Sequence, residues 1–147
     1  MKILMVCLGN ICRSPLAQGI MELHAPVDWR VDSAGTSGWH EDERPDTRSI
    51  LIAKERGIAI DHQRSRQVNE EDFETFDIIF AMDSSNYTNL IRLAPNEAAK
   101  AKVRLILNEA YPGENRQVPD PYTGGQSGFR HVYELLEEAV QSFIKKY

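Results

Sequence analysis

Residues 3–15 read ILMVCLGNICRSP and join an apolar run to a short loop of polar and small side chains. The run from Ile3 to Val6 is typical of a buried β-strand. From Pro15 onward, apolar side chains recur at helical spacing, and proline is favoured in the first turn of a helix. We therefore predict a strand, a loop over residues 7–14 and a helix, which together open a β/α unit.

The loop over residues 7–14 combines groups that can bind a phosphate and also attack it. Cys7 offers a thiol, and Arg13 offers a planar fork of donors that can hold two phosphoryl oxygens. The start of the following helix adds unpaired backbone N–H groups and the positive end of the helix dipole. The same groups favour the thiolate, which is the nucleophilic form of cysteine. The sequence therefore predicts a nucleophilic phosphate-binding loop.

Three smaller residues of this loop have predicted structural roles. Gly9 permits a positive φ and a close approach of the backbone to a ligand. Asn10 tolerates the left-handed region, and its amide can hold the shape of the loop. Ser14 is expected either to cap the following helix or to form a hydrogen bond with Cys7 Sγ, which would stabilise the thiolate.

Strands and helices alternate along the rest of the chain, which predicts an α/β fold with a parallel sheet covered by helices on both faces. The predicted strands cover residues 2–6, 29–32, 77–81 and 103–107, and the predicted helices cover residues 15–24, 47–56, 70–74, 84–93 and 127–146. We expect Asp46 or Thr47 to cap the second helix and Ser84 the fourth. Residues 33–38 are expected to form a loop, and residues 58–60 a strand or an extended connection.

Residues 108–126 form a long segment, rich in proline and glycine, that carries a second chemical group. Irregular segments of this length in a compact domain are usually functional. Pro119 and Pro121 restrict the backbone around Asp120. A carboxyl held near a bound phosphate can protonate the leaving oxygen, and Tyr122 beside it can flank an aromatic leaving group. An ordinary turn aspartate is the alternative interpretation of Asp120.

The composition indicates a soluble globular protein and argues against several function classes. The chain has 147 residues, of which 41% are hydrophobic, and this size fits a single domain over residues 1–147. The net charge of −5 argues against a nucleic-acid or membrane-surface binder, and no apolar run approaches the length of a membrane span. Two cysteines so close together make no disulfide framework, so we expect a reducing cytoplasm.

Metal and nucleotide sites have no support in the sequence. The four histidines, which are His24, His40, His62 and His131, show no ligand spacing with one another or with cysteine. We expect His40 to be a solvated loop residue. The Gly-x4-Gly-Lys-Ser/Thr motif of nucleotide hydrolases does not occur. We therefore expect a protein without a metal or another cofactor.

Residues 7–15 and the run Asp120-Pro121-Tyr122 together resemble the low-molecular-weight protein tyrosine phosphatases. Residues 29–37, 72–73 and 76–83 are similar to that family too, so the resemblance covers nearly the whole chain. It implies a three-layer α/β/α fold with a four-stranded parallel sheet. It also implies a metal-free, monomeric phosphatase that acts on phosphotyrosine-containing proteins or peptides through a cysteinyl-phosphate intermediate and releases inorganic phosphate.

The resemblance also implies a role for each matched residue. The nucleophile is Cys7, the phosphate is bound by Arg13 and the loop amides, and the general acid and base is Asp120. The other matched positions complete the loop (Leu8, Gly9, Asn10, Ile11, Cys12 and Ser14), support it (Ser33) or line the substrate cleft (Leu8, Ile11, Trp39 and Tyr122). Cys12 matches a second thiol that can form a disulfide with Cys7 under oxidation.

Three alternatives and one departure from the family pattern stay open at this point. A related arsenate reductase would need further cysteines, and none follows Cys12. A phosphoarginine phosphatase of the same fold has a small Thr where Ile11 stands. A phosphate-binding or redox-sensing module would lack turnover. Animal members place a His shortly before an Arg-Gln-Val segment, whereas His62 stands one residue too early, so it belongs either to the loop network or to the surface.

Overall fold

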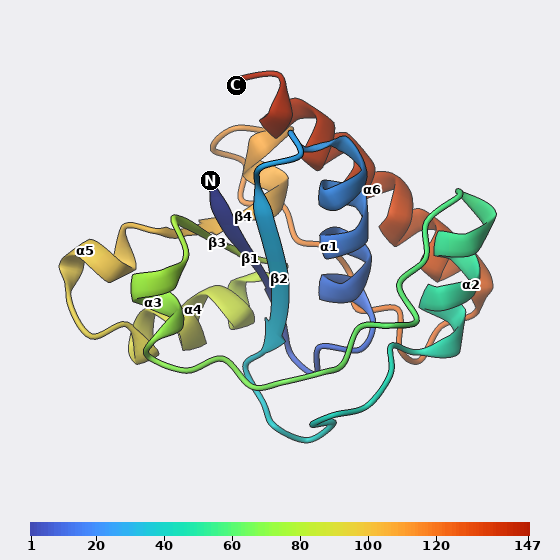
Figure 1. Cartoon of the computed structure of the whole chain (residues 1–147), viewed down its shortest axis with the longest axis horizontal. Helices are drawn as coiled ribbons and strands as arrows, with labels where there is room; N and C mark the ends of the chain where they lie inside the picture. The colour runs from blue at the N-terminus through green and yellow to red at the C-terminus, as the bar shows by residue number, and fades with distance from the viewer.

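The chain forms one parallel sheet between two layers of helices (Figure 1). A computed structural model describes all residues, 1–147. The elements in chain order are β1 (Lys2–Cys7), α1 (Arg13–His24), β2 (Arg30–Gly35), α2 (Thr47–Glu55), α3 (Asp72–Thr75), β3 (Ile78–Ala81), α4 (Ser84–Leu93), α5 (Glu97–Lys100), β4 (Val103–Leu105), the 3-10 helix η1 (Ile106–Glu109) and α6 (Gln126–Ile144). The four strands pair in the order β2-β1-β3-β4, and every pair is parallel. The predicted α/β/α class with a four-stranded parallel sheet is confirmed.

The two faces of the sheet pack against different helices. Ile3 and Met5 of β1 join a large apolar cluster with α1, α2 and α6. Leu4 and Val6 point to the other face and join a smaller cluster with α3, α4 and α5. Figure 1 shows the same division, with α1, α2 and α6 on one side of the strands and α3, α4 and α5 on the other. Burial on both faces explains why β1 reads as a continuous apolar run.

Strand β2 lies further along the chain than predicted. Trp29 is outside it, and the strand continues through residues 33–35, which were predicted as a loop. These small residues pair with the end of β1, where Met5 lies opposite Ser33 and Cys7 opposite Gly35. The prediction was wrong because small side chains are typical of loops, although a crowded sheet edge needs them too. Residues 58–60 form no strand, so the extended connection is the correct alternative.

The remaining differences concern the ends of elements. Strand β4 ends at Leu105, and η1 follows where the prediction continued the strand. The four-residue α5 was not predicted, because one turn is too short to show helical periodicity. Asp46 caps α2, as one of the two alternatives had it. The prediction for α4 was wrong, since the side chain of Asp83, not Ser84, accepts the hydrogen bond from Asn86 N.

The carboxyl ends of the parallel strands meet at one edge of the sheet, and the predicted site residues follow those ends. Cys7 ends β1, Trp39 lies in the segment after β2, and Asp120 lies in the segment after β4 and η1. Ligands of open parallel sheets bind at this edge. None of the helices combines the length and the apolar composition that crossing a membrane requires.

Candidate active site

The phosphate loop is held by side-chain hydrogen bonds that centre on Asn10. This residue is buried and has a positive φ of 56°. Its Nδ2 donates to Ser14 Oγ at 2.8 Å and to Ser33 Oγ at 2.9 Å, and its Oδ1 accepts from Arg66 N at 3.1 Å. Ser33 Oγ in turn donates to Gln18 Oε1 at 2.8 Å. The loop is thereby tied to α1, β2 and the segment around Arg66, so its shape is fixed by the fold.

Cys7 and Ser14 are neighbours at the bottom of the loop. Cys7 Sγ lies 3.1 Å from Ser14 Oγ, and both residues are buried. Ser14 Oγ already accepts a hydrogen bond from Asn10, so its own proton is free to point at the sulfur. Helix α1 begins at Arg13, and Ser14 does not cap it. Of the two predicted roles for Ser14, the structure therefore supports the hydrogen bond to Cys7.

Gly9 does not adopt the positive φ that glycine permits. The left-handed residue of the loop is Asn10, one position later. Gly9 is required instead for a close approach, because a Cβ at this position would lie 2.9 Å from Cδ2 of the His40 ring. The glycine therefore makes room for a side chain from the segment after β2 rather than for a turn.

Arg13 is oriented by two acceptors outside the loop. Its Nη1 donates to Asp83 Oδ2 at 2.7 Å and to the carbonyl of Val118 at 2.9 Å, and only 3% of the side chain is exposed. These bonds leave Nε and Nη2 to face a ligand. Sequence reasoning did not select Asp83 as a site residue. Asp83 could have been found from the sequence as an acidic residue two positions after the buried strand β3, at the edge of the sheet where the site forms.

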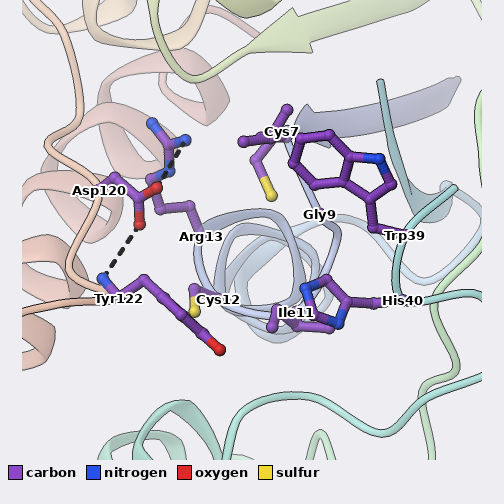
Figure 2. A pocket seen from close by; sticks show the side chains of 10 residues that line it. Cys7, Gly9, Ile11, Cys12, Arg13, Trp39, His40, Asp120 and Tyr122 are labelled. Carbon is purple, nitrogen blue, oxygen red and sulfur yellow. Dashed lines mark hydrogen bonds and ion pairs between the residues drawn. The ribbon is translucent and has the colours of Figure 1, made fainter. Parts of the chain in front are cut away.

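Asp120 lies beside Arg13 at the mouth of the pocket. Its Oδ2 is 3.9 Å from Arg13 Nη2, and its Oδ1 accepts a hydrogen bond from Tyr122 N at 3.0 Å. The carboxyl side chain is 49% exposed, unlike the buried guanidinium. Figure 2 shows Asp120 on the side of the pocket opposite Trp39 and His40, with the sulfur of Cys7 between them.

The pocket itself has a volume of about 180 Å³ and gathers most of the predicted site residues. Its lining consists of Cys7, Leu8, Gly9, Ile11, Cys12, Arg13, Trp39, His40, Asp120 and Tyr122. Trp39 and Tyr122 are exposed on its rim, whereas Ile11 is buried in its wall (Figure 2). Asn10, Ser14 and Ser33 are buried and do not line the pocket.

His40 is not the solvated loop residue that the sequence predicted. Its ring lines the pocket against Gly9, and its Nδ1 lies 2.9 Å from Glu43 Oε2. Its position next to Trp39, a predicted cleft residue, could have indicated that His40 lines the pocket. The acidic run that follows His40 favoured a solvated segment instead. His62, in contrast, is exposed, and the network around Asn10 contains no histidine, so the surface alternative is correct.

Cys12 is the second thiol of the loop, and its environment differs from that of Cys7. Both cysteines are free thiols and both line the pocket. Burial raises the pKa of Cys12 far above its ordinary value, and the nearby carboxylate of Asp46 raises it further. Cys12 is therefore a neutral thiol at physiological pH. No group of three or more His, Cys, Asp or Glu side chains is arranged to hold a metal ion.

Comparison with known proteins shows which family this chain resembles over its length. The model of the family described as "Low molecular weight phosphotyrosine protein phosphatase" matches residues 2–147. The low molecular weight phosphotyrosine protein phosphatase of Schizosaccharomyces pombe is 43% identical over 151 aligned positions, which cover 98% of this chain and 95% of the relative. Both matches extend over almost the entire sequence, and they include the phosphate loop and Asp120.

Solved structures agree with the sequence comparisons. A protein tyrosine phosphatase from Entamoeba histolytica, with Hepes in its active site, superposes with a TM-score of 0.92 at 42% identity, covering 99% of this chain and 96% of that one. A Drosophila arginine phosphatase superposes with a TM-score of 0.91 at 33% identity, covering 100% and 98% of the two chains. The chain belongs to the low molecular weight phosphotyrosine protein phosphatase family, and it is a phosphatase by that membership.

Proposed function

We propose that this protein hydrolyses phosphotyrosine, and simple aryl phosphates, through a cysteinyl-phosphate intermediate. The observation that carries the proposal is the meeting of Cys7, Arg13 and Asp120 around one pocket of about 180 Å³. These groups can act as nucleophile, phosphate ligand and proton donor. Membership in a phosphotyrosine phosphatase family supports the same reaction.

In the first step, the Cys7 thiolate attacks phosphorus in line with the bond to the phenol oxygen. The Sγ–P bond forms as the P–O bond breaks, and the carboxyl of Asp120 donates its proton to the departing oxygen. The hydroxyl of Ser14, 3.1 Å from Cys7 Sγ, stabilises the thiolate before attack. This step releases the dephosphorylated phenol and leaves phosphate bonded to the sulfur.

In the second step, water attacks the phosphorus of the intermediate. Asp120, now a carboxylate, accepts a proton from that water, the new O–P bond forms, and the Sγ–P bond breaks. The products are inorganic phosphate and the restored thiolate. The exposed position of Asp120 at the pocket mouth suits both roles, since water and substrate reach it from solvent.

Arg13 and the loop amides stabilise the equatorial oxygens in both steps. Preorganised donors of this kind usually supply the largest part of transition-state stabilisation. Asp83 and the Val118 carbonyl hold Nη1 of Arg13, so its remaining donors face the phosphoryl group without reorganisation. Asn10, Ser14 and Ser33 act on the loop and not on the substrate.

The apolar wall and rim of the pocket favour a phosphate carried on an aromatic ring. Ile11 lies in the wall, and Trp39 and Tyr122 lie on the rim where they can flank that ring. A second candidate is phosphoarginine, because a Drosophila arginine phosphatase has a very similar structure. A branched apolar side chain at Ile11 packs well against a flat ring and offers a guanidinium no polar partner.

A turnover panel tests the proposed function and the second candidate together. Phosphotyrosine, phosphoserine and phosphoarginine peptides and p-nitrophenyl phosphate are compared, with Ile11→Thr beside the wild-type protein. We expect phosphotyrosine turnover to dominate and Ile11→Thr to shift the ratio toward phosphoarginine. Dominant phosphoarginine turnover by the wild-type protein would replace the proposal with the second candidate.

A rapid-mixing experiment separates catalysis from a binding or redox-sensing module. An aryl phosphate should release one equivalent of phenol per active site in a burst when the second step is slower than the first. Absence of both burst and steady turnover would support a module that only binds phosphate.

The proposal extends to the setting of the enzyme. We propose one phosphatase domain over residues 1–147 that acts as a monomer in the cytoplasm without a metal or other cofactor. All three reacting groups come from one chain, which supports a site complete in the monomer. Both cysteines are free thiols, and a reducing compartment keeps them so.

A further inference from the structure

Arg48, in the first turn of α2, is bonded to the segment that carries Asp120. Its Nη2 donates to the carbonyl of Tyr122 at 2.8 Å and its Nη1 to the carbonyl of Gly124 at 2.9 Å. The other hydrogen bonds of residues 119–125 are local: from Tyr122 N to Asp120 Oδ1, from Gly124 N to the Pro121 carbonyl and from Gly128 N, in the first turn of α6, to the Gly125 carbonyl. Arg48 therefore provides the two long-range hydrogen bonds of this segment, which is exposed except at Pro121.

The guanidinium of Arg48 is itself held in place. Asp46 accepts from its Nε and its Nη2, each at 3.0 Å, in a two-point ion pair. The guanidinium carbon lies 4.5 Å from the ring centre of Phe129 and 5.7 Å from that of Tyr122. A planar fork engaged at both edges and stacked on a ring loses little further freedom when it binds the segment. Hydrogen bonding from Arg48 also lowers the pKa of Asp46, so the ion pair persists at neutral pH.

The same stretch of chain is bonded to the phosphate loop. Asp46 N donates to the Ile11 carbonyl at 2.8 Å, and Ser49 Oγ donates to the Cys12 carbonyl at 3.1 Å. Residues 46–49 therefore contact the nucleophile's loop on one side and, through Arg48, the acid's segment on the other. This bridge adds to the direct contacts of Arg13 with the Val118 carbonyl and with Asp120, and together they set the distance between the two halves of the site.

Arg48 is not part of the pocket lining, and its Nε, Nη1 and Nη2 all donate to acceptors within the protein. It can therefore act on the reaction only through the segment that it binds. We propose that Arg48 is a positioning residue, which fixes the carboxyl of Asp120 over the phosphate loop for proton transfer. This inference rests on the proposed function, in which Asp120 is the general acid.

The test is the dependence of kcat/KM on the leaving group in Arg48→Met. Methionine removes the donors and keeps an apolar stem against Phe129. Phenyl phosphate needs its leaving oxygen protonated, whereas 2,4-dinitrophenyl phosphate does not. We expect kcat/KM for phenyl phosphate to fall about 10- to 100-fold and kcat/KM for the dinitrophenyl ester to change by less than about threefold. Equal losses for the two esters would overturn the proposal, because a general disturbance of the site does not depend on the leaving group.

A double variant separates the failure of this inference from the failure of the proposed function. In an Asp120→Ala background, Arg48→Met should cause no further loss, since there is no carboxyl left to position. If Asp120→Ala alone shows no leaving-group dependence, the assignment of the acid fails. If Asp120→Ala shows it and Arg48→Met does not, only the role of Arg48 fails.

Arg56→Met is the matched control. Arg56 follows the same helix, stacks on Tyr133 of α6 at 4.9 Å and pairs with Glu134 at 3.7 Å, but it does not contact the Asp120 segment. We expect its kinetics to match those of the wild-type protein with both esters.

Two milder variants keep the test decisive if Arg48→Met does not fold. Arg48→Lys keeps the charge without the fork, and Asp46→Asn keeps a helix-capping side chain without the ion pair. In each variant, kcat/KM for phenyl phosphate should fall less than in Arg48→Met but still more than kcat/KM for the dinitrophenyl ester. Thermal unfolding checks that both variants are folded. If the ratio of kcat/KM between the two esters in both variants equals that of the wild-type protein, the proposal is overturned.

Discussion

The phosphate loop and the segment that carries Asp120 form two halves of one pocket, but they are held in different ways. Most of the loop is buried, and Asn10 bonds to the side chains of Ser14 and Ser33 and to the backbone N–H of Arg66. The acid segment is exposed except at Pro121, and its other hydrogen bonds are local. Its long-range hydrogen bonds come from Arg48, beside the 3.9 Å ion pair between Asp120 and Arg13. Phosphate binding is thus built into the core, whereas proton transfer depends on a few surface contacts. The two functions should therefore be separable by mutation.

Cys7→Ser should have the largest effect, and it should affect chemistry alone. We expect kcat to fall on the order of 10⁴- to 10⁶-fold, because a neutral hydroxyl replaces the thiolate. Inorganic phosphate should still bind within about threefold of its wild-type affinity in titration calorimetry, since Arg13 and the loop amides remain. Substantial turnover by this variant would remove Cys7 from the nucleophile's role.

Asp120→Ala should damage the other half of the site without disturbing the first. We expect kcat/KM for phenyl phosphate to fall on the order of 10²- to 10⁴-fold, the usual contribution of general acid catalysis. The free energy of unfolding should change by no more than about 0.5 kcal/mol, because the side chain is half exposed. Unchanged turnover of phenyl phosphate would contradict the role, and a marked loss of stability would contradict the contrast between the halves.

Asn10→Ala should disturb the buried half through stability. The change removes three side-chain hydrogen bonds and leaves a residue with a β-carbon at a φ of 56°. At about 1 kcal/mol for each bond, we expect the free energy of unfolding to fall by about 3 kcal/mol, with weaker phosphate binding. Chemical denaturation measures the first effect and calorimetry the second.

Asn115→Ala is the control for that experiment. Asn115 also has a positive φ, 54°, but it lies in an exposed turn where it bonds only to Asn108. We expect a loss of about 1 kcal/mol and unchanged phosphate affinity. Equal losses from the two variants would mean that backbone strain, and not the buried network, explains the effect of Asn10→Ala.

The smallest effect is expected at Cys12. Because its pKa is raised, Cys12 stays protonated at neutral pH, whereas alkylation requires a thiolate. Iodoacetate at pH 7 should therefore modify Cys7 alone, and Cys12→Ala should be inactivated at the wild-type rate. Peptide mapping by mass spectrometry identifies the modified sulfur. Faster labelling of Cys12 than of Cys7 would contradict the assignment of Cys12 as the protonated, less reactive thiol.

The sequence predicted the residues of the phosphate loop because they are consecutive and their chemistry is specific. Cys7 and Arg13 needed only a preceding strand and a following helix to suggest a site. Asp120 was predicted because two prolines and a long irregular segment made it distinctive. In both cases the signal lies within a few neighbouring residues.

The residues that the sequence did not reveal act across large separations in the chain. Asp83 bonds to Arg13, His40 packs on Gly9, and Arg48 bonds to the Asp120 segment, yet the neighbours of these residues in sequence do not specify such distant partners. Gly9 shows the same limit, since its space is used by a side chain about thirty positions away and not by a local turn. Such contacts exist only once the sheet has brought the loops together.

The position of β1 inside the sheet affects when the site can form during synthesis of the protein. β1 is synthesised before β2 and β3, yet it lies between them, and helix α6, which packs with α1 in the same apolar cluster, is synthesised after all four strands. A growing chain therefore carries the thiol of Cys7 while Asp120 and α6 are still absent. Since distant contacts must close before they stabilise anything, this thiol becomes a controlled nucleophile only after α6 has been made.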